Sequence, residues 1–165
     1  LGPRFTQPHL RRLALTNICL PLAAGRAKAE PARLEMARTE ALEFRRTLNQ
    51  KSPPETPLEV IEGAQDGLGV PLWVLLQGQE LGVWSEVEEL PGRFVLTRLL
   101  EKNDDPQPQR ELFKVEVASF YYVDDPFSLS SAALNASYIV VNPAWEPLMP
   151  GFWRYHKAQP EEKTP

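Results

Sequence analysis

The side chain with the clearest potential for acid–base chemistry is Asp66, which lies in a glycine-rich segment, Gly63–Gly69. A carboxylate on a loop could act as a general acid or base, as in a hydrolase. That chemistry needs a second titratable group within reach, and the sequence around Asp66 offers none. Glu86, Glu88 and Glu89 occupy a segment with the pattern of a strand, which favours a solvated sheet face.

Nucleophilic and metal-based chemistry have even less support. Cys19 is the single cysteine and lies in an apolar run, which is typical of a small buried side chain. His9 and His156 are the only histidines and stand at opposite ends of the chain, so the spacing predicts no transition-metal site. The nucleophile elbow of serine hydrolases and the phosphate-binding P-loop are both absent from the sequence. We therefore expect no metal, no cofactor and no recognisable catalytic nucleophile.

The composition indicates a folded protein in which many segments are extended or turning. Of its 165 residues, 42% are apolar and 17 are proline, about twice the usual share. No apolar run approaches the roughly 18 residues of a membrane span. Residues 1–50 carry nine basic and four acidic side chains. Several arginines follow a glutamate by three positions, as in Glu35 and Arg38, which favours ion pairing on a helix over nucleic-acid binding.

The order of apolar patterns and turn signals predicts an α+β fold. We expect an antiparallel sheet of about four strands, covered by one long helix and one or more short helices. The expected strands are Arg12–Leu22, Leu58–Ile61, Val83–Leu90, Phe94–Leu100 and Arg110–Val123. The long helix is expected over Ala32–Asn49, where the apolar stripe consists of Leu34, Ala37, Ala41, Phe44 and Leu48. Between these, we expect a loop at Gly63–Gly69, a helix or turn at Val70–Leu76 and a hairpin turn at Leu90-Pro91-Gly92.

Changes in composition divide the chain into four parts. Residues 10–102 are expected to form one domain and residues 103–109 a linker. Residues 110–156 are expected to be an extension that holds a strand and an irregular part rich in aromatic residues and proline. Within it, residues 132–141 fit a helix or a strand equally well. Residues 157–165 are expected to be a disordered tail.

Five short motifs occur in an order that resembles the parvulin type of peptidyl-prolyl isomerase. They are Ala14–Leu20, Arg38–Leu48, Asp66–Gly69, Gln79–Gly82 and Gly92–Leu96. They are similar, in turn, to the family's first strand with Ala-x-His-Ile-Leu, its long helix, its Gly-Gly-Asp-Leu-Gly loop, its Gly-Glu-Val-Ser segment and its last strand with Gly-Phe-His-Val. The resemblance covers residues 12–102 and implies a parvulin-like sheet in which the first and last strands are central neighbours.

The resemblance also implies a proline-binding pocket, whose polar floor carries two histidines in the family. Here Asn17 stands at the first histidine position and the second falls on Arg93 or Phe94, which implies weak or absent isomerase activity. The implied pocket residues are Asn17, Leu68, Trp73, Leu76 and Phe94. By similarity to the family's phospho-directed members, a basic loop is expected to receive an anionic group; it consists of Arg26, Lys28 and Arg33.

The sequence thus predicts a chaperone-like domain that binds proline-containing or unfolded polypeptide segments, with little or no isomerase activity. The alternative is a structural subunit of a larger protein complex, docked through aromatic residues of the extension, namely Trp145, Phe152, Trp153 and Tyr155. In both cases the partner is protein or peptide. No leader segment precedes Leu1, so we expect a processed form or a fragment. The family resemblance alone favours a location in the periplasm or cell envelope.

Overall fold

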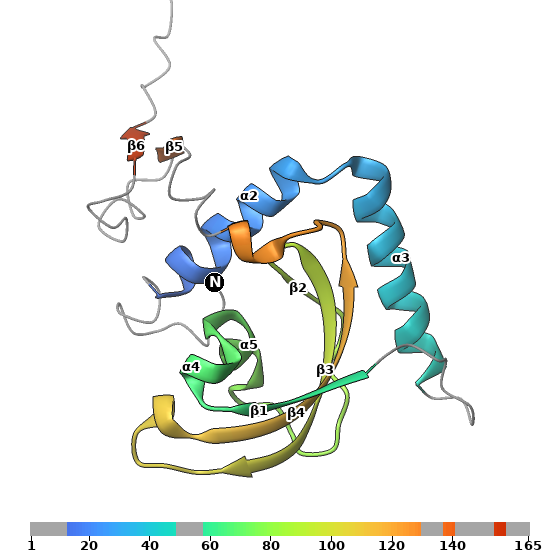
Figure 1. The fold of residues 1–165 in the computed structure, drawn as a ribbon, viewed down its shortest axis with the longest axis vertical. Helices are drawn as coiled ribbons and strands as arrows, with labels where there is room; N and C mark the ends of the chain where they lie inside the picture. Colours follow the sequence, from blue (N-terminus) through green and yellow to red (C-terminus); the bar gives the residue numbers. More distant parts are fainter. Residues whose placement is uncertain (1–12, 49–57, 130–136, 141–153, 158–165) are drawn as a thin grey trace, which may run out of the picture.

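A computed structural model of the chain describes residues 13–48, 58–129, 137–140 and 154–157. These residues form an α+β fold with a four-stranded antiparallel sheet, as the sequence predicts (Figure 1). The strands are β1 (Leu58–Gly63), β2 (Glu88–Leu90), β3 (Arg93–Asn103) and β4 (Leu112–Tyr121). They lie in the order β1-β4-β3-β2, so β3 and β4 are the two central strands.

Helices cover both faces of the sheet. A π-helical turn, η1 (Leu15–Cys19), leads into α2 (Leu20–Lys28), and α3 (Pro31–Thr47) follows. Two shorter helices, α4 (Gln65–Leu68) and α5 (Val70–Leu76), lie between β1 and β2 in the chain. Single 3-10 turns, η2 (Pro108–Arg110) and η3 (Pro126–Ser128), flank β4, and β5 (Ser137–Val140) pairs in parallel with β6 (Arg154–Lys157). In Figure 1, α3 runs along one side of the sheet, while α4 and α5 lie on the other.

The long helix forms where its apolar stripe predicts it. Pro31 occupies the first turn, where a missing N–H is harmless. Ala37, Ala41 and Phe44 are buried at a spacing of four and three residues, so one stripe faces the sheet. Leu34 and Leu48, the ends of the predicted stripe, are partly buried against the same cluster. The prediction of this helix is therefore confirmed to within two residues at its C-terminal end.

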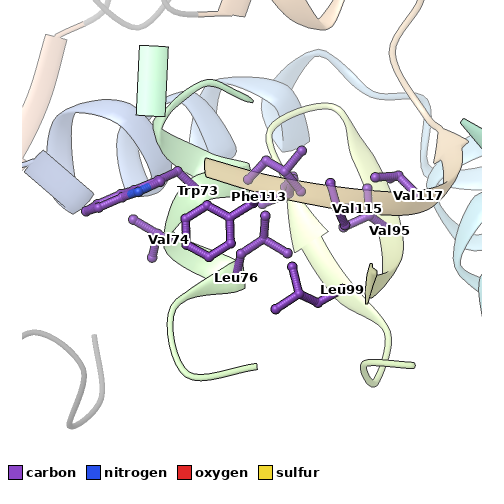
Figure 2. Packing of buried hydrophobic residues seen from close by; sticks show 10 residues of the cluster. Trp73, Val74, Leu76, Val95, Leu99, Phe113, Val115 and Val117 are labelled. Atoms are coloured by element: carbon purple, nitrogen blue, oxygen red, sulfur yellow. The ribbon is translucent and has the colours of Figure 1, made fainter. Parts of the chain in front are cut away.

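The central strands are apolar on both faces because each face packs against a helix. Val95 and Leu99 point towards α5, in a cluster with Leu76, Phe113 and Val115 (Figure 2). Phe94 and Leu96 belong to the cluster on the α3 side, where the ring centroids of Phe44 and Phe120 are 5.7 Å apart. Because both faces of β3 are covered, buried residues follow one another along its first half, and strict alternation of apolar and polar residues is absent.

The loop between α5 and β2, residues 77–87, runs beside β3, and hydrogen bonds from Gln79 hold it there. Gln79 Nε2 donates to the carbonyl oxygen of Thr97 at 2.8 Å, and Thr97 Oγ1 donates to Gln79 Oε1 at 2.9 Å. Among the residues that the structure describes, Thr97 is the one buried polar residue of the core, and this pairing satisfies its hydroxyl. As a consequence β2 is only three residues long, whereas the sequence predicts a strand from Val83.

The strand predicted at Arg12–Leu22 is wrong for every described residue, since the chain is helical from Leu13 to Lys28. The residues of this segment that face the core are three or four positions apart, as in a helix, but nearly every residue of the short run is apolar, so this spacing does not stand out in the sequence. Ala14, Pro21 and Gly25 are buried, and Ile18 packs against the core between them. Pro21 lies in the first turn of α2, where proline is well accommodated, so it begins a helix rather than ending a strand.

Two further expectations differ from the structure. β4, placed in the C-terminal extension by the sequence, lies between β1 and β3, so the boundary expected at residues 103–109 falls inside the sheet. The segment expected to be a loop at Gly63–Gly69 contains the short helix α4, because Gly67 adopts a helical conformation there. The predicted tail at 157–165 falls outside the described residues except for Lys157, which ends β6.

Candidate functional site

A groove opens at the end of the sheet that carries the β2–β3 turn, on the face covered by α5. We call it the proline groove because four of its walls are prolines: Pro21, Pro71, Pro91 and Pro126. Its volume is about 230 Å³. The other lining residues are Asn17, Leu68, Gly69, Leu72, Leu90, Arg93, Tyr121 and Phe127.

Each proline stands where the local backbone tolerates its missing N–H. Pro21, Pro71 and Pro126 all occupy the first turn of a helix, in α2, α5 and η3. Pro91 precedes Gly92, which has a φ of 80°, in the two-residue turn between β2 and β3. The helix starts and the turn therefore converge to give a stiff, apolar wall with few backbone donors.

The floor of the proline groove carries one cation. Arg93 Nη1 donates to the Tyr121 hydroxyl at 3.0 Å and to Ser119 Oγ at 3.1 Å. The guanidinium carbon lies 5.5 Å from the centroid of the Tyr121 ring, which is a cation–π geometry. Phe127, at the rim, is 91% exposed. The groove thus combines an apolar wall, an exposed aromatic ring and a positioned positive charge.

A second hollow lies on the opposite face, between α3 and β2, with a volume of about 470 Å³. Its lining mixes apolar residues with both signs of charge: Arg26, Leu34, Glu35, Arg38, Leu42, Val87, Glu89 and Phe94. Arg26 forms an ion pair with Glu89, with Nε donating to Oε1 at 2.8 Å. The Tyr122 hydroxyl donates to the same carboxylate at 3.1 Å and accepts from the N–H of Gly92 at 3.2 Å. This network engages two of the four charged side chains that line the hollow, Arg26 and Glu89, with neighbouring groups of the protein.

The buried hydroxyl of Tyr122 makes the stability of the protein sensitive to alkaline pH. Burial, followed by the neighbouring Glu89 carboxylate, raises the pKa of Tyr122 above its ordinary value. The folded protein therefore holds the phenolic proton more tightly than the unfolded chain. Its contribution is complete below about pH 10 and is lost as the pH rises through the folded-state pKa. We expect the free energy of unfolding to fall above about pH 10, and less steeply in Tyr122→Phe.

Urea titrations at a series of alkaline pH values measure this slope directly. The matched control is Thr39→Val, which removes an exposed hydroxyl that does not titrate and should leave the slope of the wild-type protein unchanged. Identical slopes for the wild-type protein and Tyr122→Phe would contradict the role given to the buried hydroxyl.

The structure distributes the predicted pocket residues over three places. Asn17 and Leu68 both line the proline groove, although Asn17 lies in a π-helical turn and its amide donates to the carbonyl oxygen of Leu13 at 2.9 Å. Phe94 lines the second hollow on the other face of the sheet. Trp73 and Leu76 are buried in the core and line neither hollow. Figure 2 shows them in the α5 cluster, with the Trp73 indole directed away from Phe113.

The expectation that Asn17 and Phe94 lie on neighbouring central strands is also wrong. The residue directly opposite Phe94 on the neighbouring central strand is Phe120 of β4. Asn17 belongs to the helical segment that packs beside α5 and has no place in the sheet. The two aromatic residues face α3, and Phe44 packs against Phe120 there.

The basic residues expected to receive an anion are largely engaged with carboxylates. Arg26 pairs with Glu89, and Arg33 Nη2 donates to Asp124 Oδ1 at 2.7 Å instead of pairing along its own helix. That ion pair lowers the pKa of Asp124 below its ordinary value. Lys28 is exposed and makes no ion pair with any residue the structure describes. The three cations therefore do not form a common anion site.

The remaining candidates give no catalytic centre within the described part of the chain. Asp66 Oδ1 accepts the N–H of Gly67, its neighbour in α4. Residues 13–48, 58–129, 137–140 and 154–157 contain no group of three histidine, cysteine or carboxylate side chains that could hold a metal ion. The same residues include no helix long and apolar enough to cross a membrane.

The aromatic docking residues of the alternative prediction cannot be placed in a site. Trp145, Phe152 and Trp153 lie outside the described residues. Tyr155 is in β6, where its Cα partner in the parallel pair is Tyr138 of β5. The idea of an assembly subunit therefore stays a prediction.

Sequence reasoning missed most of the proline groove. Arg93, Tyr121 and Phe127 are contributed by three different elements, β3, β4 and η3. One signal was present, since Arg93 comes directly after the predicted Leu90-Pro91-Gly92 turn and falls on or next to a position matched to a family histidine. Comparisons with known protein families, with curated proteins and with solved structures found no match to this chain. Function must therefore be inferred from the groove and its residues.

Proposed function

We propose that this chain is a non-catalytic, parvulin-like domain that holds a short extended polypeptide segment in its proline groove. The observation that carries the proposal is an apolar groove lined by four prolines, with the 91% exposed ring of Phe127 at its rim. A large aromatic side chain left almost fully in water favours a contact surface. The groove's volume of about 230 Å³ is below the roughly 300–1,000 Å³ typical of small-molecule sites, which favours a ligand that inserts only one or two side chains.

The strand order supports a relation to the parvulin family in rearranged form. In that family the first strand precedes the long helix and lies beside the last strand. Here β4 lies beside β3, and its Ala118-Ser119-Phe120 is similar to the start of the family's Ala-x-His-Ile-Leu. Placing β4 ahead of the helices would reproduce the family's order of strand, helix, loop, helix and hairpin. On this reading the two histidine positions correspond to Phe94 and Phe120, which lie opposite each other.

The same correspondence supports the absence of catalysis. Rotation about a prolyl bond must overcome a barrier of about 18–20 kcal/mol, and an isomerase lowers it by binding the twisted amide better than either planar form. Phe94 and Phe120 offer no proton or hydrogen bond to a twisted amide, and both are covered by α3 and Phe44. An apolar groove on the other face can bind a segment without favouring its twisted form.

Binding and catalysis are tested separately. A fluorescently labelled, proline-containing hexapeptide with two leucines is titrated with the protein, and binding is followed by anisotropy. We expect Phe127→Ala to weaken binding about tenfold, because removing an aromatic contact of this kind typically exceeds 1 kcal/mol. Phe127 is so exposed that its loss should leave the free energy of unfolding nearly unchanged.

The control is Leu81→Ala, which shortens an apolar side chain that is 59% exposed outside the groove and should bind the peptide like the wild-type protein. Equal weakening by both substitutions would show general stickiness instead of a groove. A protease-coupled isomerase assay at micromolar protein completes the test. A rate that rises with protein concentration would overturn the non-catalytic part of the proposal.

A further inference from the structure

The cation in the proline groove lacks a counter-charge. Arg26, Arg33, Arg45 and Arg98 each form an ion pair with a glutamate or aspartate. Arg93 instead donates to two neutral hydroxyls, and no carboxylate of the described residues pairs with it. It is also the one charged residue among the described residues that line the groove. Its positive charge is therefore held in place, partly buried and open to a ligand.

A bound segment changes the surroundings of this charge. An apolar ligand that fills the groove removes water from the Arg93 guanidinium, and desolvating an unpaired cation is unfavourable. A carboxylate on the ligand replaces the lost water with a charge-assisted hydrogen bond, for which the planar guanidinium is well suited. Tyr121 and Ser119 already fix one nitrogen of the group, so little side-chain freedom remains to be lost on binding.

We propose that Arg93 makes the proline groove selective for a peptide segment that carries an aspartate or glutamate side chain within an apolar stretch. The inference rests on the proposed function and adds the chemical identity of the ligand to it. Two effects then distinguish an acidic segment from a neutral one. A matching acid is attracted, and a neutral apolar segment is disfavoured because it leaves Arg93 dry and unpaired.

The test compares two hexapeptides that are blocked at both ends and contain one proline, two leucines and either one glutamate or one glutamine. Blocking the ends removes the terminal carboxylate, so the side chain is the only anion present. We expect the wild-type protein to bind the glutamate peptide about tenfold more tightly than the glutamine peptide, and the ratio to fall as salt rises. In Arg93→Gln the two peptides should bind equally.

Arg110→Gln is the matched control, since it removes an exposed arginine that does not line the proline groove and should keep the tenfold ratio. Arg93→Lys keeps the charge but not the planar group and should retain only part of the ratio. The glutamine peptide with a free C-terminus is a further arm, and tighter binding of this peptide than of the blocked glutamate peptide would overturn the assignment to a side-chain carboxylate.

The ways in which the proposals can fail are distinguishable. If the wild-type protein binds both blocked peptides equally, the selectivity of Arg93 is overturned while the groove stands as a binding site. If it binds neither, the proposed function and this inference fall together. The ratio measured on the wild-type protein needs no substitution, so the conclusion does not depend on the folding of the Arg93→Gln variant.

Discussion

Replacing Gly92 by alanine should lower the free energy of unfolding by about 2–4 kcal/mol. Gly92 has a φ of 80°, a conformation that costs other residues roughly 1–2 kcal/mol. An added Cβ would also lie 2.8 Å from Pro126 Cβ and 3.2 Å from Leu129 Cδ1, and overpacking of this kind adds about 1–3 kcal/mol. Urea denaturation measures the change, and binding of the proline-containing peptide should fall as well because Pro126 lines the groove.

Substitutions at two other glycines separate the cost of the positive φ from the cost of the close contacts. Gly78 has a similar φ of 78°, but a Cβ there would meet no atom within 4 Å, so Gly78→Ala should show the backbone penalty alone. Gly67 has neither a positive φ nor a close neighbour, and Gly67→Ala should be nearly neutral or slightly stabilising. Equal losses for Gly92→Ala and Gly78→Ala would contradict the close contact between the β2–β3 turn and η3.

The largest loss of stability is expected from Phe113→Ala, about 3–5 kcal/mol. Phe113 is fully buried, near Leu76 in the cluster between α5 and the central strands (Figure 2). Its removal deletes a large apolar surface and leaves a cavity that the surrounding strands cannot close completely. Because proteins of this size are stable by only about 5–15 kcal/mol, thermal and urea unfolding should both shift markedly.

The neighbouring residue provides the control for Phe113. Leu112→Ala shortens a side chain that is 45% exposed at the start of the same strand, and its effect should stay within about 0.5 kcal/mol. Phe113→Leu should recover part of the loss, since it refills much of the volume. A small effect of Phe113→Ala would mean that α5 does not pack on the sheet as described.

The elements with a clear local pattern could be predicted from the sequence. The apolar stripe of α3 and the strand patterns of β3 and β4 are local, because each is set by residues a few positions apart. All three elements were predicted near their observed positions. The segment before Lys28 failed because a short, wholly apolar run fits both a buried helix and a strand. Pro21 was the deciding residue, because a proline can end a strand or begin a helix, and the residues after Pro21 determine which of the two occurs.

The candidate site was harder to predict because its residues come together only through the order of the strands in the sheet. Asn17 and Leu68 were identified, but their partners Arg93 and Tyr121 meet them only once β4 pairs with β3. No local pattern specifies which strands become neighbours, and the interpretation of 110–156 as an extension removed β4 from the sheet altogether. Phe127 was missed for the same reason, since it reaches the groove from the turn after β4.

The adjacency of β3 and β4 along the chain has a consequence for how the protein folds. The middle of the sheet is a hairpin joined by one connection, and the bulge between Leu99 and Glu101 interrupts its ladder only once. Bringing these two strands together closes a short loop, so its entropy loss is small compared with that of docking β1 or the N-terminal helices. We expect the hairpin to be ordered in the folding transition state, and the helices, which complete the ligand groove, to dock afterwards.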